Sequence, residues 1–108
     1  METPPVEIVS PPIAVRRGQL VRVHGWVRVP HPITASVEGL KVYDSCGGPA
    51  LADRIRVTDG WREFVLYRAA SRDDQVTVTF ALTGLGEAWL DDVTIALHDP
   101  ISAEPIRE

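Results

Sequence analysis

The chain has 108 residues and a formal net charge of −4, with 44% hydrophobic and 24% charged residues. This length fits one soluble domain, and the composition is that of a globular protein rather than a disordered chain. The basic residues are scattered along the chain, whereas nucleic-acid binding requires a concentrated positive surface. No apolar run approaches the ~18 residues of a membrane span. We therefore expect neither nucleic acid nor a membrane as a partner.

The first half of the chain predicts turns and short strands. Residues 1–5 form a proline-rich lead that we expect to be disordered. The stretch from Val6 to Val9 lies between two proline pairs, which predicts an edge strand because proline cannot donate to a ladder. Residues 20–29 alternate with the period of a half-buried strand. The inward residues would be Val21, Val23, Gly25, Val27 and Val29, and the outward residues Arg22, His24, Trp26 and Arg28.

The middle of the chain predicts a hairpin. A strand over 37–44 would place Leu40 and Val42 inward and Tyr43 outward. The residues at 44–49, DSCGGP, are typical of a turn, and they lead into a strand at 51–57. The same residues superficially resemble the nucleophile loop of trypsin-like proteases, but the interrupting Cys46 and the short chain favour the turn. With one cysteine, no intrachain disulfide is expected.

The second half predicts three further strands and no helix. Residues 61–69 would turn Phe64 and Leu66 to one face and Tyr67 to the other. Residues 75–83 alternate most clearly, with Val76, Val78, Phe80 and Leu82 inward. A strand over 88–97 closes the pattern, and residues 98–108 are expected to form a flexible tail. The sequence thus predicts an all-β, antiparallel β-sandwich over residues 6–97.

One irregularity falls in the last strand. Leu90 and Val93 are three residues apart, so both cannot face the core of a regular strand. Either Asp91 and Asp92 form a β-bulge, or Asp91 points inward and is held by hydrogen bonds or an ion. A catalytic carboxylate pair is disfavoured, because adjacent residues of a strand point to opposite faces.

Three segments, in order, resemble carbohydrate-binding modules with the galactose-binding-like jelly roll: VRRGQLVRVHGWVR at 15–28, GWREF at 60–64 and LDDVTI at 90–95. The resemblance implies a jelly roll without catalytic activity. Such modules begin with a further segment that has no counterpart here, so the sandwich would be incomplete at its N-terminus. The structural calcium of many relatives takes ligands from that segment and from a closing aspartate, which Asp91 or Asp92 matches. We expect no cofactor; the alternative is a structural calcium, for which the sequence does not supply a full ligand set.

The outward aromatic residues are the candidate site. Trp26, Tyr43 and Tyr67 would present rings on which sugars stack, and rim side chains would supply hydrogen bonds. Those rim side chains are Arg22, His24 and Arg28. The alternative is that a loop or a further strand buries these aromatics. We interpret Trp61 and Trp89 as structural plugs at the sandwich edge.

These observations predict a non-catalytic module that binds carbohydrate or polysaccharide. The alternative is a structural or protein-interaction sandwich, a spacer or oligomerisation module, whose sheet is completed by another chain or by the missing strands. If the chain belongs to a longer exported protein, its location is extracellular or the cell surface. No catalytic constellation is visible, since the three histidines lack metal-type spacing.

Overall fold

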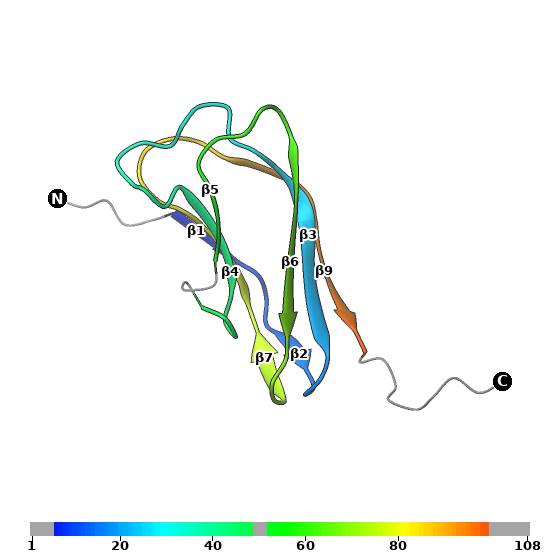
Figure 1. Ribbon diagram of the computed structural model, residues 1–108. Helices are drawn as coiled ribbons and strands as arrows, with labels where there is room; N and C mark the ends of the chain where they lie inside the picture. Colours follow the sequence, from blue (N-terminus) through cyan, green and yellow to red (C-terminus); the bar gives the residue numbers. More distant parts are fainter. Residues whose placement is uncertain (1–5, 49–51, 100–108) are drawn as a thin grey trace.

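The computed structural model describes residues 6–48 and 52–99. In this part of the chain there are nine strands and no helix (Figure 1). The strands are β1 (Val6–Val9), β2 (Ile13–Val15), β3 (Leu20–Arg28), β4 (Leu40–Asp44), β5 (Asp53–Ile55), β6 (Arg62–Ala69), β7 (Asp74–Val76), β8 (Val78–Leu82) and β9 (Trp89–His98). The predicted all-β class is confirmed. The predicted lead, 1–5, and residues 100–108 of the tail predicted over 98–108 lie outside the described residues, while His98 is the last residue of β9.

Two antiparallel sheets form the layers of the sandwich (Figure 1). One has the order β1-β8-β4-β5 and the other the order β6-β3-β9, while β2 and β7 pair separately. Strands from distant parts of the sequence are neighbours in both sheets. The strand β3 pairs with β6 on one side and with β9 on the other. The outer face of the three-stranded sheet therefore combines residues from three separate segments.

The core lies between the inner faces of the two sheets. Phe64 on β6 contacts Phe80 on β8 edge-to-face, with ring centroids 6.0 Å apart and planes at 73°, a favoured aromatic geometry. Gly25 lies beside this contact, and a Cβ atom there would come within 3.0 Å of the Phe64 ring. The predicted inward residues of β3 and β4 are confirmed as buried. They pack with the other core residues Val15, Ile33, Ile55, Val76 and Val78.

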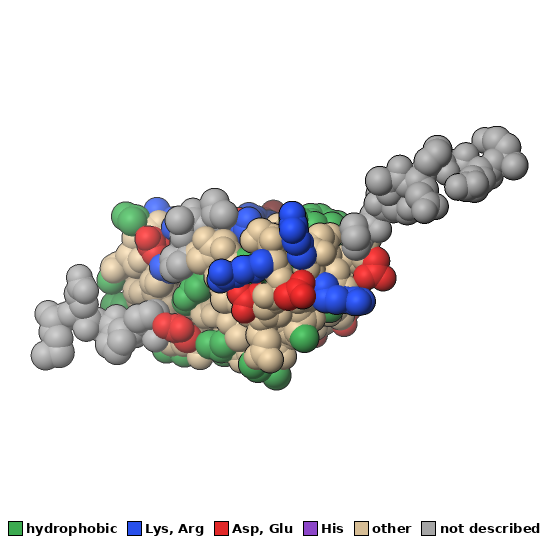
Figure 2. All heavy atoms as spheres, turned by 90° about the horizontal axis from the view of Figure 1, so that it is seen from below, with side chains coloured by type: hydrophobic (Ala, Val, Ile, Leu, Met, Phe, Trp, Pro, Cys, Tyr) green, Lys and Arg blue, Asp and Glu red, His purple; other side chains and the backbone are tan. Residues whose placement is uncertain are grey.

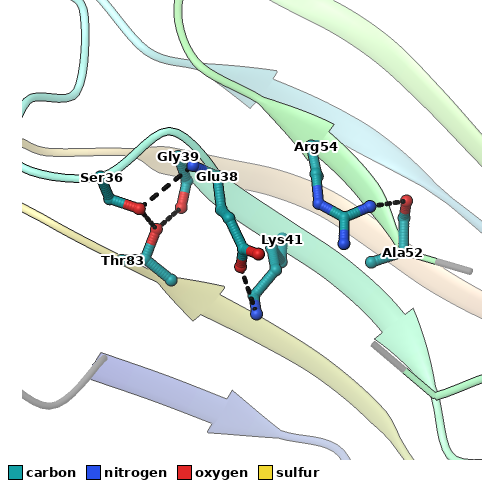
Figure 3. A network of polar contacts seen from close by, with 7 residues as sticks. All are labelled: Ser36, Glu38, Gly39, Lys41, Ala52, Arg54 and Thr83. Carbon is teal, nitrogen blue, oxygen red and sulfur yellow. Dashed lines mark hydrogen bonds and ion pairs between the residues drawn. The ribbon is translucent and has the colours of Figure 1, made fainter. Parts of the chain in front are cut away.

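The strand predicted over 37–44 begins only at Leu40. Gly39 has a φ of 68°, which an extended strand cannot contain, and a tight hydrogen-bonded turn precedes it (Figure 3). The hydroxyl of Thr83 donates to the Gly39 carbonyl at 2.6 Å and lies 2.8 Å from the hydroxyl of Ser36. The backbone N–H of Glu38 donates to Ser36 at 3.1 Å. These bonds fix the turn to the end of β8.

The strand predicted over 75–83 is divided at Thr77. Its first part, β7, pairs with β2, and its second part, β8, pairs with β1 and β4. Between β1 and β2 the chain contains Pro11 and Pro12, which have no N–H to continue the ladder. Instead, the Thr77 N–H donates to the side-chain hydroxyl of Ser45 at 3.1 Å, and the Thr77 carbonyl accepts from the Ser45 N–H at 2.9 Å.

The β-bulge alternative for Asp91 and Asp92 is confirmed. The register of β3 with β9 shifts between His24 and Trp26, and Asp92 has a φ of 53°. The extra residue allows Leu90 and Val93 both to pack against the core. Asp91 is exposed on the outer face, so the alternative of an inward Asp91 is wrong.

Candidate functional site

The candidate site is the outer face of the β6-β3-β9 sheet, which we call the tryptophan face. It carries three aromatic and five polar or charged side chains that alternate outward along the three strands, together with a fourth aromatic, Trp61, which precedes β6. The members are Trp26, Trp61, Tyr67, Trp89, Arg22, His24, Arg28, Glu63 and Asp91.

The aromatic side chains of this face are substantially exposed. The exposed fractions are 37% for Trp26, 45% for Trp61, 51% for Trp89 and 53% for Tyr67. The chain contains three tryptophans, and single exposed hydrophobics are ordinary whereas a group of large ones marks an interaction surface. The alternative, in which a loop or a further strand buries these aromatics, is not seen for Trp26 and Tyr67 among the described residues.

The interpretation of Trp61 and Trp89 as structural plugs is wrong. Both side chains are close to half exposed, because both continue the outward alternation of their segments. Trp61 has the parity of Glu63 and Tyr67 in β6, and Trp89 precedes the inward Leu90. The alternation of inward and outward side chains along 61–67 and at 89–90 is the pattern in the sequence that predicts an outward position for both tryptophans.

The register of β3 with β9 arranges four side chains in a block. Trp26 is paired with Asp91, and two residues further along Arg28 is paired with Trp89. Directly paired side chains on one face lie about 5 Å apart at Cβ, and diagonal ones about 7–8 Å. Each indole therefore has one charged residue directly opposite it, and the two indoles occupy one diagonal of the block.

Trp61 extends this block across the sheet. The last paired residues of β3 and β6 are Val27 and Arg62, and Trp61 comes directly before this pair, on the β6 side of β3. The two neighbours of β3 thus bring a tryptophan to each side of this strand. Since adjacent strands are ~4.8 Å apart, Trp61 and Trp89 are separated by about 10 Å.

Two of the predicted rim residues already have partners on the sheet. Nε2 of His24 lies 2.6 Å from Oε2 of Glu63, an ion pair when the imidazole is protonated. Nε of Arg22 donates to the hydroxyl of Tyr67 at 3.3 Å. Arg28 and Asp91 form no ion pair with any residue in 6–48 or 52–99. Arg28 and Asp91 thus offer a free donor group and a free acceptor group.

The sequence grouped Tyr43 with Trp26 and Tyr67, and the structure separates them. Tyr43 lies on the outer side of β4, in the four-stranded sheet, where its side chain is half-buried. The core lies between it and the tryptophan face, so one ligand cannot contact both. Alternation gave the correct orientation of Tyr43 but not the sheet to which its strand belongs.

A hollow of about 190 Å³ lies far from the tryptophan face, beyond the other end of β6. It is lined by Ser45, Cys46, Ser71, Arg72 and Asp74. Burial raises the pKa of the Cys46 thiol, and the carboxylates of Asp44 and Asp74 add to this rise, so the thiol is a poor nucleophile. Figure 2 views this end of the molecule and shows basic and acidic side chains mixed.

Residues 6–48 and 52–99 contain no group of three or more His, Cys, Asp or Glu side chains arranged to hold a metal ion. The same residues include no helix with the length and apolar character needed to cross a membrane.

Comparison with known proteins found no match for this chain among protein-family models, curated proteins or solved structures.

Proposed function

We propose that the protein is a non-catalytic glycan-binding module that uses the tryptophan face. The observation that carries this proposal is the block of Trp26, Asp91, Arg28 and Trp89. Exposed indoles stack on the C–H faces of pyranose rings, while a free guanidinium and a free carboxylate hydrogen-bond to hydroxyl groups. The resemblance of residues 15–28, 60–64 and 90–95 to carbohydrate-binding modules with a galactose-binding-like jelly roll supports the same function.

Binding without hydrolysis is the expected outcome, although two carboxylates flank Trp26. Glu63 pairs with Trp26 from β6 and Asp91 pairs with it from β9, so the two are about 10 Å apart at Cα. Glu63 is engaged by His24, and both acidic side chains lie on an exposed sheet face. Glycosidases place their carboxylates in a site that closes around the scissile bond.

The proposal is tested by titrating the protein with soluble glycans, using tryptophan fluorescence and isothermal calorimetry. Trp26→Ala and Trp89→Ala should each weaken binding by about tenfold or more, since one stacking contact is lost. Tyr43→Ala is the matched control, because it removes an aromatic from the opposite sheet and should leave the affinity unchanged. Equal losses from Tyr43→Ala and Trp26→Ala would reject the tryptophan face as the site.

A second candidate function, strand-mediated protein interaction, is favoured by the edge strand β1. Among the described strands it pairs with β8 alone, and Val6, Ile8 and Val9 are all exposed. An apolar edge with one charged residue, Glu7, is a template for pairing with a strand of another chain.

Light scattering over a range of protein concentrations separates this candidate from glycan binding. Under the interaction hypothesis the mass rises with concentration, and Ile8→Lys abolishes the rise. Val37→Lys is the control, since Val37 is also apolar and exposed but lies outside the strands. A concentration-independent monomer would count against self-association through β1.

A further inference from the structure

We infer that the ligand of the tryptophan face is an uncharged glycan chain contacted over about three consecutive sugar rings. The inference rests on the proposed function and adds two properties of the ligand, its charge and its length. The charge follows from the balance of ionic groups on the face. The length follows from the positions of the three tryptophans on three different segments.

The ionic groups of the face balance one another. Arg22 and Arg28 carry positive charge, and Glu63 and Asp91 carry negative charge. An acidic polymer would meet the unpaired Asp91 next to Trp26, and that carboxylate has no basic partner in the described part of the chain to neutralise it. A desolvated like-charge contact is strongly unfavourable. A sugar hydroxyl group, in contrast, can accept a hydrogen bond from Arg28 and can donate one to Asp91.

The tryptophans are too widely spaced for one sugar ring. Trp61 and Trp89 lie on either side of β3, about two strand spacings or 10 Å apart. Trp26 is diagonal to Trp89, about 7–8 Å away at Cβ. A single pyranose covers one indole, so it would leave the other two exposed. A chain of about three rings can contact all three exposed indoles.

The experiment compares neutral and acidic probes of defined length. Xylose, xylotriose, xylohexaose, glucose, cellotriose and cellohexaose are titrated by calorimetry, together with hexagalacturonate, at 50 and 500 mM NaCl. For at least one neutral series, we expect the affinity to rise by about tenfold or more from one ring to three rings and then to level off. Its affinity should be unchanged by salt, because screening affects only interactions between charges.

Two variants test the charge assignment directly. Arg28→Ala and Asp91→Ala should both weaken neutral binding by about tenfold, because each removes hydrogen bonds to hydroxyl groups. Arg28→Gln keeps two N–H donors and should recover part of the loss. For an acidic ligand Asp91→Ala would instead strengthen binding. Both side chains are exposed, and an unchanged melting temperature confirms that each variant is folded.

The outcomes separate this inference from the proposed function. Tighter binding of hexagalacturonate than of every neutral chain, with strong salt dependence, would overturn the uncharged ligand. A single sugar bound as tightly as its hexamer would overturn the three-ring contact. In both cases the proposed glycan binding would stand. Absence of binding to all seven probes would reject the proposed function itself.

Discussion

Arg68 and Asp44 join the two sheets through an ion pair at the edge of the core. Nε of Arg68 on β6 lies 3.0 Å from Oδ1 and 3.2 Å from Oδ2 of Asp44 on β4. The Asp44 side chain is only 1% exposed, and the N–H of Gly47 donates to it at 3.2 Å. A carboxylate this deeply buried is tolerated because these donors replace water. The pair therefore links the β4–β5 turn to the sheet that carries the tryptophan face.

We predict that Arg68→Ala lowers the free energy of unfolding by about 3 kcal/mol, because it leaves the Asp44 carboxylate buried without its cation. The double variant Asp44→Leu/Arg68→Met should recover part of that loss, since apolar replacements of a buried pair are often close to neutral. Urea unfolding followed by circular dichroism measures both.

Gly47→Ala is a further probe of the same pair. A Cβ atom at this position would lie 2.6 Å from Nη2 of Arg68, so the guanidinium must move away from Asp44. We expect a loss of about 1–2 kcal/mol, within the range for strained substitutions. Gly48→Ala provides the contrast, since a Cβ there meets no atom within 4 Å, although its φ of 66° adds backbone strain. If Arg68→Ala has no effect on stability, the ion pair does not hold the sheets together.

Ala35 has a φ of 64°, in the left-handed region that costs an L-residue with a Cβ about 1 kcal/mol or more. Its side chain is exposed, so Ala35→Gly loses little burial. We expect this variant to raise the free energy of unfolding by about 0.5–1 kcal/mol, even though glycine has more freedom in the unfolded chain. Thermal unfolding at constant pH measures the change, and a lower melting temperature would contradict it.

The ion pair between Glu38 and Lys41, at 2.6 Å, predicts a pH dependence of stability (Figure 3). The hydrogen bond and charge of Lys41 hold the pKa of Glu38 below its usual value of 4.5, and Arg54 contributes in the same direction. A lowered folded-state pKa contributes stability above the unfolded-state pKa, and that stability is lost as pH falls through the folded-state pKa.

Wild type should therefore lose more stability than Glu38→Gln as the pH is lowered from 6 through 4.5 toward 3. Because the side chain is exposed, we expect the difference to be small and to shrink in high salt. Urea midpoints of both proteins along this pH series, with and without 0.5 M NaCl, provide the measurement. Parallel pH profiles would show that the pair contributes nothing.

The exposure of all three tryptophans predicts an unusual fluorescence signature. Acrylamide should quench the folded protein nearly as efficiently as the unfolded protein in urea, because no indole of Trp26, Trp61 and Trp89 is in the core. The emission maximum should shift little on unfolding. Trp61→Phe and Trp89→Phe should each remove a readily quenched component of the emission. If the emission lost in either variant, compared with wild type, is strongly protected from acrylamide, the exposure of that tryptophan is contradicted.

Much of the local structure could be predicted from the sequence. Alternation along 20–29 gave the inward and outward faces of β3, and the spacing of Leu90 and Val93 led to the bulge as one of two alternatives. These features depend on the alternation of side chains along a single strand, and the order of residues alone is enough to read that alternation. The division at Thr77 was missed because it arises from hydrogen-bond partners 32 and more positions away, such as Ser45.

The sequence by itself determined that the chain is all-β and that Trp26, Tyr43 and Tyr67 point away from the core. Only the tertiary structure decided which of them share a surface. It separated Tyr43 from the other two and brought Trp61 and Trp89 to the two sides of β3. The physical reason is that alternation sets the face of a strand, whereas its neighbours are set by long-range pairing and by burial of the common core.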